Sequence, residues 1–270
     1  MAFDNKNNQF ISSVYSSLSV LEYLASEENS ESTLTEIAQS VSINKSTCLR
    51  ILKTLELKDY VHFNTSSKKY KLGSYLIALG EKSKEVNDYL STAISYLPVI
   101  CNDISHFVNH MVVLAKPIDP YNLGYIAKEV PNEKIRLTIS TGEIFPLVAG
   151  AVGKAFTAHL PEEKREAIIE DFLVDGKLPK FTERTTTNPV EFLNDLRSIE
   201  KEGIAVSNSE HTRGILAIAC PIFDHSGNVI LSVGLFIHDS IVNEQLNMSE
   251  IKSNLKKHAD TITSKISRYV

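Results

Sequence analysis

The sequence predicts an α+β chain with two domains, and three observations support this prediction. Before residue 73, apolar residues follow a helical period and lead into a short hairpin pattern. Beyond residue 98, apolar strand patterns alternate with helical ones, which indicates an antiparallel sheet covered by helices on one side. A chain of 270 residues is also long enough for two domains of ordinary size. We expect domains at 10–73 and 98–270, joined by a linker helix region at 74–97.

The composition is that of a soluble globular protein, with 43% hydrophobic and 23% charged residues. No apolar run approaches the roughly 20 residues that a membrane-spanning helix needs, and the first residues lack a signal-peptide pattern. Cys48, Cys101 and Cys220 are widely spaced and odd in number, which favours reduced thiols over a disulfide framework. We therefore expect a cytoplasmic protein with no membrane partner.

Charge is distributed unevenly along the chain. Residues 1–41 contain one lysine and six acidic residues, a balance of −5, whereas residues 42–72 contain seven basic and two acidic residues, a balance of +5. Residues 73–270 account for a further −5, so the net charge of −5 conceals a local basic segment. Binding to phosphate groups requires such a local positive surface and not a basic chain.

Three helices are expected before residue 60. The first, over 12–26, is predicted by apolar residues spaced along one helical face, namely Val14, Leu18, Leu21 and Ala25. Thr35, with Glu36 in the first turn, is the expected N-cap of a short second helix. Asn44 or Ser42 is expected to cap a third helix that runs to about Leu57.

The third helix has one apolar and one basic face. Its apolar face comprises Cys48, Ile51, Leu52 and Leu55, and its opposite face comprises Ser46, Arg50 and Lys53, with Lys45 and Thr47 near the start. After it, Tyr60–Phe63 and Lys69–Leu72 are typical of two strands that flank a turn, so we expect a hairpin whose lysines lie near backbone phosphates.

Two helices joined by a tight turn, the second of them basic on its exposed face, fit the major groove of DNA. Arg50 can bond a guanine edge with two hydrogen bonds, while Ser46 and Thr47 can reach phosphate or base. The candidate DNA-binding residues are Thr35, Lys45, Ser46, Thr47, Arg50, Lys53, Lys68 and Lys69. The alternative is an ordinary helical bundle with a solvated basic face, and the hairpin argues against it.

The segments SSVYSSLSVLEYLAS, STLTEIAQSVSINKSTCLRILKTLELKDYV and KKYKLGSYLIALG resemble the winged helix-turn-helix domain of the IclR family of bacterial transcriptional regulators. The family's arginine late in the recognition helix falls on Arg50. The Tyr-Arg-Leu-Gly motif at the end of the family's wing corresponds to residues 70–73 of this chain. Lys71 stands in place of the arginine, which keeps the positive charge but loses the planar guanidinium group.

Helical spacing continues through 74–97, with an expected break near Gly80 and an end at Pro98, and a further helix is expected from there through about Val108. The segments HMVVLA, YNLGYIAKEV and EKIRLTI are predicted strands, and GILAIACPIFD and NVILSVGLFI are predicted to form a long hairpin. Helices are expected at 150–160, 161–172 and 189–201, and the last helix over 248–269.

The C-terminal part also resembles the IclR family, and the resemblance spans about residues 10–245. GIAVSNSEHTRGILAIACPIFD satisfies the family's signature, and GEIFPLVAGAVGKAFTAHLPEE is similar to the loop and helix that cap its ligand pocket. The resemblance implies a GAF-like effector-binding domain for a small, often anionic metabolite. The effector-binding residues that it implies are Leu137, Phe145, Ala151, Val152, Ser207, Ile215, Ala217, Gly234 and Phe236. Backbone amides at a helix start near residue 151 can receive a carboxylate.

The family's sensors of small oxoacids place an acid, a cysteine and two serines around the ligand. Here those positions fall on Ser207, Ala217, Gly234 and Phe236. Fewer hydroxyls and one aromatic ring predict a less polar or larger ligand, such as an aromatic or acyl compound.

Isolated motifs in the sequence also suggest other chemistries. His211 near Cys220 suggests a thiol nucleophile, but Cys220 lies in an apolar strand pattern that favours an inert thiol. His106 and His110, four apart on an expected helix, lack the glutamate of the zinc-protease motif. Residues 150–154 resemble half a phosphate loop without its full spacing. We therefore expect no enzyme activity, no cofactor and no bound metal.

The sequence thus predicts a ligand-responsive transcriptional regulator, more often a repressor than an activator, that binds a palindromic double-stranded DNA operator. The resemblance implies a homodimer or homotetramer. The alternative is an enzyme or a protein-interaction module whose helix-turn-helix does not bind DNA.

Overall fold

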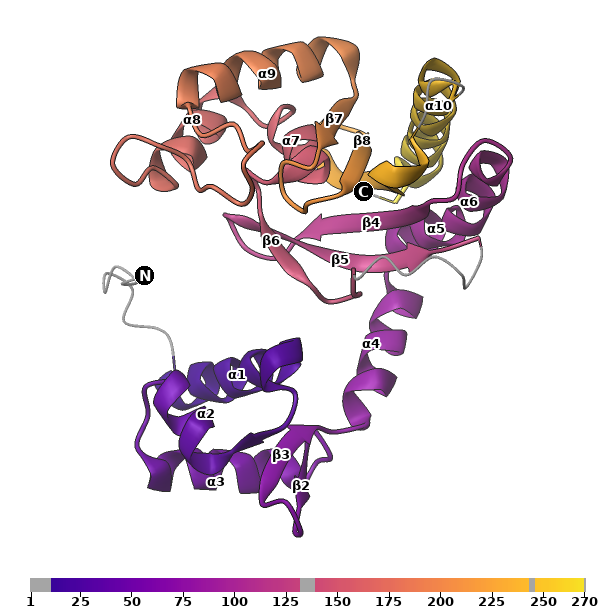
Figure 1. Cartoon of the computed structure of the whole chain (residues 1–270). Coiled ribbons are helices and arrows are strands. Elements are labelled where there is room, and N and C mark those ends of the chain that lie inside the picture. The colour runs from indigo at the N-terminus through magenta and orange to yellow at the C-terminus, as the bar shows by residue number, and fades with distance from the viewer. Residues whose placement is uncertain (1–10, 132–138, 243–245, 270) are drawn as a thin grey trace. The chain divides into compact units, whose positions relative to one another are not determined.

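The computed structural model describes residues 11–131, 139–242 and 246–269 (Figure 1). Two compact units, Met1–Val86 and Asn87–Val270, contain most of its contacts. Each unit has its own apolar core. The α+β architecture agrees with the prediction, although the helices of the second unit are arranged differently from the expectation.

The N-terminal unit is a winged helix-turn-helix. Its helices are α1 (Ser12–Ala25), α2 (Leu34–Ser40) and α3 (Lys45–Glu56), with the short 3₁₀ helix η1 (Glu27–Asn29) after α1. Strands β1 (Ser32–Thr33), β2 (Val61–Asn64) and β3 (Lys69–Leu72) form a sheet in the order β1-β3-β2. The hairpin of β2 and β3 is the expected wing, and β1 is a strand that the sequence did not reveal.

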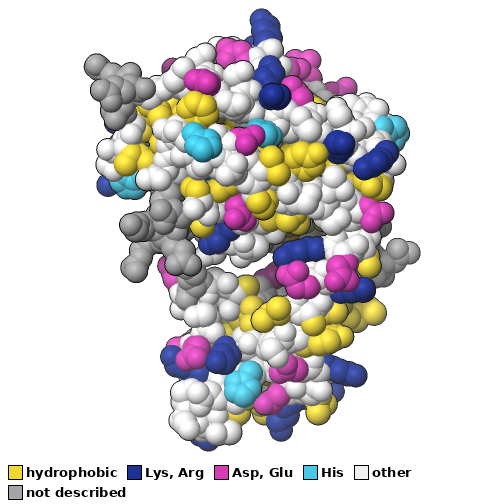
Figure 2. Space-filling view, turned by 90° about the vertical axis from the view of Figure 1, so that its right-hand side faces the viewer, with side chains coloured by type: hydrophobic (Ala, Val, Ile, Leu, Met, Phe, Trp, Pro, Cys, Tyr) yellow, Lys and Arg dark blue, Asp and Glu magenta, His cyan; other side chains and the backbone are white. Residues whose placement is uncertain are grey.

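Helix α1 buries a different face from the predicted one. Its buried residues are Val20 and Leu24, whereas Val14 and Leu18 are each 53% exposed. Hydrophobic side chains also reach the surface of this unit on the face that Figure 2 shows. Of the predicted residues, Leu21 packs against the core, whereas Val14 and Leu18 form an exposed apolar stripe.

The N-cap of α2 is Thr33 and not Thr35. The Thr33 side chain accepts a hydrogen bond from the Glu36 amide, and the Glu36 carboxylate accepts one from the Thr33 amide at 2.7 Å. This reciprocal capping box satisfies two amides at once, which explains why the helix starts two residues earlier than predicted. Thr35 lies in the first turn of α2, half-buried.

Helix α4 (Tyr75–Val86) runs through Gly80 without a break and buries none of its residues. The helical conformation is instead interrupted at Asn87, before α5 (Asp88–Ser95). Helix α5 ends at Ser95, and α6 (Leu97–Ser105) is the further helix that was expected, although it ends before Val108. Pro98 lies in the first turn of α6, where a missing amide hydrogen costs nothing.

The C-terminal unit is built on one antiparallel sheet. Its described strands are β4 (Met111–Pro117), β5 (Asn122–Glu129), β6 (Ile144–Pro146), β7 (Ala205–Asn208), β8 (Ile215–Phe223) and β9 (Val229–His238), in the order β6-β5-β4-β9-β8-β7. The remaining helices are α7 (Gly150–Thr157), α8 (Glu162–Asp171), α9 (Pro189–Glu202) and α10 (Met248–Ile266), with the 3₁₀ helix η2 (Asp239–Ile241). The expected strand EKIRLTI falls almost entirely outside the described residues.

Helices cover both faces of this sheet, so the prediction of helices on one side is wrong (Figure 1). Successive residues of β4 alternate between two cores: Val113 and Ala115 pack toward α7 and α9, and Val112 and Leu114 pack toward α5, α6 and α10. Burial on both faces explains why β4 reads as a continuous apolar run without a polar alternation. None of the helices in the described ranges is both long and apolar enough to cross a membrane.

Candidate DNA-binding surface and ligand pocket

Helix α3 is held in place by its cap and its apolar face. The Asn44 side chain accepts hydrogen bonds from the Thr47 amide at 2.8 Å and from the Ser46 hydroxyl at 2.6 Å. Cys48 and Leu52 are fully buried against α1 and α2. These contacts fix which face of α3 points outward.

The outward face of α3 carries the predicted contact residues. Lys45, Ser46, Arg50 and Lys53 are exposed, and Thr47 is half-buried. No acidic residue lies in the first turn of α3. The exposed face is therefore polar and basic, as contact with a phosphate backbone and base edges requires.

The wing places two more lysines beside a tight turn. Asn64 accepts hydrogen bonds from the amides of Ser66 and Ser67, and Lys68 has a positive φ of 58°. The ammonium of Lys68 lies 6.0 Å from the centre of the Phe63 ring. Lys68 is exposed and Lys69 is half-buried, so both stand at the wing as predicted.

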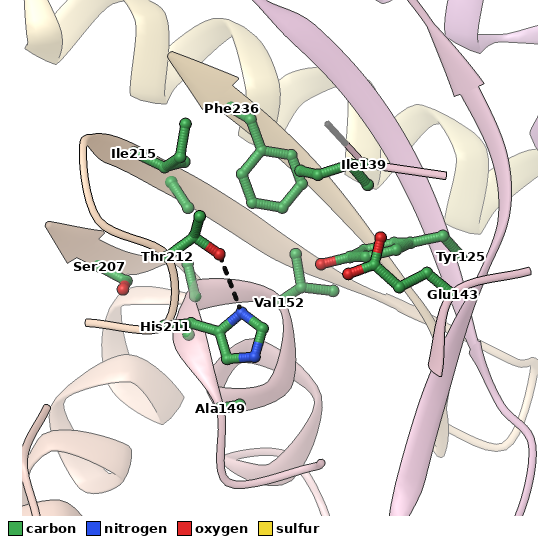
Figure 3. A pocket seen from close by; sticks show the side chains of 13 residues that line it. Tyr125, Ile139, Glu143, Ala149, Val152, Ser207, His211, Thr212, Ile215 and Phe236 are labelled. Carbon is green, nitrogen blue, oxygen red and sulfur yellow. Dashed lines mark hydrogen bonds between the residues drawn. The ribbon is translucent and has the colours of Figure 1, made fainter. Parts of the chain in front are cut away.

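A small pocket lies between α7, the sheet and the loop that joins β7 to β8 (Figure 3). Its lining residues are Tyr125, Ile139, Glu143, Ala149, Gly150, Ala151, Val152, Ser207, His211, Thr212, Ile215, Ala217 and Phe236. The walls leave about 30 Å³ between them, whereas ligand pockets typically span about 300–1,000 Å³. A ligand larger than a few atoms therefore requires part of the wall to move.

Aromatic rings form one side of the pocket. Tyr125 stacks on Phe145 at 4.4 Å between ring centroids and meets Phe236 edge-on at 6.0 Å. Tyr125 is 5% exposed, and none of the described residues forms a hydrogen bond with its hydroxyl. Burial raises the pKa of Tyr125 well above its usual value, so this hydroxyl is protonated and available as a donor.

The opposite side is formed by residues 209–214, which we call the strap. It carries His211, whose ring packs 4.9 Å from that of Phe181, and Thr212, whose hydroxyl lies 3.3 Å from His211 Nδ1. Burial lowers the pKa of His211, which favours the neutral imidazole. Ser209 and Gly214, at the ends of the strap, both have a positive φ.

Six of the nine predicted effector-binding residues line this pocket: Ala151, Val152, Ser207, Ile215, Ala217 and Phe236. Phe145 lies behind Tyr125 and is not part of the lining. Gly234 packs against α7, since a Cβ there would lie 2.6 Å from Val152 Cγ2. Leu137 falls outside the described residues.

The sequence analysis missed several polar lining residues, including Tyr125, Glu143, His211 and Thr212. His211 and Thr212 stand within the segment that resembles the family signature, a few residues after Ser207, and this position was a usable signal. Glu143, just before β6, likewise lies in the segment that resembles the pocket cap, whereas Tyr125 on β5 gave no such signal. The pocket is therefore more polar than the sequence comparison implied.

The residues of the thiol and metal alternatives lie apart in the structure. Burial raises the pKa of Cys220 to about 12, and its side chain packs in the core that faces α10, away from His211. His106 caps the end of α6 and His110 precedes β4, so they do not share a helix. Among the described residues, no group of three or more His, Cys, Asp or Glu side chains is arranged to hold a metal ion.

A winged helix-turn-helix joined to an α+β domain with an internal pocket defines a two-domain DNA-binding regulator. Comparison with family models agrees: the IclR helix-turn-helix domain matches residues 16–64, and the bacterial transcriptional regulator IclR C-terminal domain matches residues 96–264. The chain therefore belongs to the IclR family. It is a DNA-binding transcriptional regulator and not an enzyme.

Known relatives are similar over most of their length. KdgR, an HTH-type transcriptional regulator of Escherichia coli K12, is 29% identical over 231 residues, which cover 86% of this chain and 84% of KdgR. The transcriptional repressor IclR of the same strain is 27% identical over 214 residues, 79% of this chain and 75% of that protein. The crystal structure of an IclR transcriptional regulator from Alicyclobacillus acidocaldarius is similar to this structure, with a TM-score of 0.86 and 29% sequence identity. The similarity covers 94% of this chain and 98% of the chain in that crystal structure.

Proposed function

We propose that this regulator is a cytoplasmic repressor that binds a palindromic operator as a dimer and responds to a small carboxylate-bearing metabolite. The observation that carries the DNA-binding role is the exposed basic face of α3 beside the lysines of the wing. In this arrangement Arg50 reads a base edge, while Lys45, Lys53 and the wing lysines contact phosphates. The similarity to the transcriptional repressor IclR supports repression over activation.

The exposed apolar stripe of α1 supports a dimer. Ile11, Val14 and Leu18 are each more than half exposed, and Ile77 of α4 is 70% exposed. Such residues are costly on a monomer surface and are typical of an interface. A two-fold dimer would place two α3 helices on successive major grooves, which is why we expect a palindromic operator.

The pocket supports a carboxylate ligand. Helix α7 begins at Gly150 without a side-chain cap, so the first amides of the helix, including those of Ala151 and Val152, can donate to an anion. Ser207, 3% exposed, also lines the pocket, and none of the described residues forms a hydrogen bond with its hydroxyl. On the far side lie the Tyr125 hydroxyl and the Glu143 carboxylate, which would receive a polar group at the other end of the ligand (Figure 3).

Ligand binding would change operator affinity only if the ligand prefers one arrangement of the dimer over another. Because half-site spacing is fixed by the dimer, a small change transmitted through α4 would misplace one recognition helix.

Fluorescence anisotropy with duplex DNA tests this proposal. The purified protein should bind the region upstream of its own gene at least about a thousandfold more tightly than random duplex at 0.15 M salt, roughly the lower end of specific binding. Glyoxylate, pyruvate and a panel of aromatic acids are then added to the complex. Release by one of these acids, and not by the matched amide, supports carboxylate sensing. Equal affinity for both duplexes would contradict the proposal.

A further inference from the structure

Lys154 is a buried cation on α7 that neither the DNA-binding surface nor the pocket lining uses. It is 2% exposed, and its ammonium lies 2.7 Å from Asp195 Oδ2 on α9. The same ammonium also contacts the carboxylate of Glu210. Burial of an ammonium is unfavourable unless it is paired, so these two carboxylates define its position.

The two carboxylates differ in where they stand. Asp195 belongs to a helix that packs on α7 away from the pocket, whereas Glu210 is the second residue of the strap. Glu210 is followed directly by His211 and Thr212, which line the pocket. Lys154 itself lies one helical turn after Ala151, which also lines the pocket. This ion pair therefore joins the strap to α7, which forms another wall of the pocket.

The beginning of the strap is held independently of this ion pair. The Thr182 hydroxyl donates to the Ser209 carbonyl at 2.6 Å, and the Thr185 hydroxyl donates to the Glu210 carbonyl at 2.6 Å. These bonds anchor its backbone to residues 181–185, which are not part of α7. Loss of the ion pair would thus remove the charged contact between the strap and α7. It would leave these hydrogen bonds, and the close approach of His211 to Gly150, in place.

We propose that Lys154 and Glu210 are positioning residues that latch the strap onto α7 and control how readily the pocket opens. The inference rests on the proposed function, because it takes this pocket as the effector site. The pocket leaves about 30 Å³ between its walls, so a ligand larger than a few atoms requires part of the wall to move, and in this proposal that part is the strap. When the strap lifts, Glu210 leaves Lys154, and Asp195 remains as the partner of the buried ammonium. This second carboxylate makes the latch reversible.

Hydrogen exchange of the full-length protein, followed by mass spectrometry without ligand, tests the latch. Glu210→Gln keeps the shape of the side chain and removes its charge, and Asp195→Asn is the matched control, because it removes a charge from the same lysine but not from the strap. In Glu210→Gln we expect strap amides to exchange at least about tenfold faster, consistent with the loss of a charge-assisted hydrogen bond. We expect Asp195→Asn to leave strap exchange within about threefold of the wild type, and exchange within β8 to stay unchanged in both variants.

Equal acceleration in both variants would overturn the proposal, because the cluster would then contribute general stability. So would unchanged strap exchange in Glu210→Gln, or acceleration that extends equally through β8. The experiment needs no ligand, so a negative effector screen would contradict the proposed function while leaving the latch intact. Unchanged strap exchange would contradict the latch alone.

Discussion

The Tyr125 ring stacks on Phe145 at 4.4 Å between centroids, while its hydroxyl points into the pocket without a hydrogen bond to a described residue (Figure 3). The two ends of this side chain therefore have separate roles. The ring stabilises the wall, and the hydroxyl is available to a ligand.

Replacement of Tyr125 by Phe separates these roles. The stacking is retained and only a hydroxyl that faces the pocket is removed, so the free energy of unfolding should change by less than about 1 kcal/mol. Urea denaturation measures this change, and release of operator DNA by the active acid should weaken in parallel. A loss of more than about 1 kcal/mol would show that the hydroxyl serves the fold.

Gly234→Ala should destabilise the C-terminal unit by about 1–3 kcal/mol. The added Cβ would lie 2.6 Å from Val152 Cγ2 and 3.0 Å from Val113 Cγ2, so α7 would have to move away from the sheet. The matched control is Gly80→Ala, where a Cβ meets nothing within 4 Å on exposed α4, and a gain of about 0.5–1 kcal/mol in helix stability is expected. Thermal denaturation of both variants checks the contrast, and similar effects at the two glycines would refute it.

As the pH falls, the free energy of unfolding should decrease at pH values above those at which the carboxylates become protonated. Burial lowers the pKa values of His110 and His211 in the folded protein, while in the unfolded chain both return to about 6.5. The unfolded state therefore binds more protons as the pH falls below about 6.5, and stability is lost from there downward. Urea denaturation at pH 7.5 and pH 5.5 should show this loss, and it should be smaller in His211→Gln. An unfolding free energy that does not change over this interval would count against the buried neutral state.

Leu18→Glu should convert the proposed dimer to a monomer. It places a charge in the exposed apolar stripe of α1, and like charges would face each other across a two-fold axis. The control is Leu57→Glu, at an 84% exposed leucine beyond the end of α3. Sedimentation velocity distinguishes the two, and a Leu18→Glu variant that sediments like the wild type would exclude this stripe as the dimer interface.

The winged helix was predictable from the sequence because its signals are local. Asn44 caps α3, the apolar spacing selects Cys48 and Leu52, and the strand pattern continues directly into the wing. The side of α1 that faces the core was not predictable, because helical spacing does not distinguish a core contact from a subunit contact. The capping box of Thr33 was missed because Thr35 also precedes acidic and apolar residues in a plausible order.

The pocket was only partly predictable. Resemblance located Ala151 and Ser207, which lie on the two quoted segments, and Phe236 on the last strand. Tyr125 lies on a predicted strand whose sequence does not indicate which face meets the strap. Gly234 was assigned to the pocket by resemblance, yet it is needed for close packing of α7. The positions of Tyr125 and Gly234 both depend on contacts between elements that lie far apart in the sequence.

The most direct test of the central claim is a comparison of wild-type protein and Arg50→Ala on operator DNA and random duplex of equal length. The wild type should prefer the operator, and Arg50→Ala should lose about 1–3 kcal/mol of binding free energy together with sequence preference at one base pair. Lys69→Ala, a phosphate-contact control, should weaken binding to all sequences alike and reduce the salt dependence. Unchanged affinity and sequence preference in Arg50→Ala would contradict the assignment of α3 as the recognition helix.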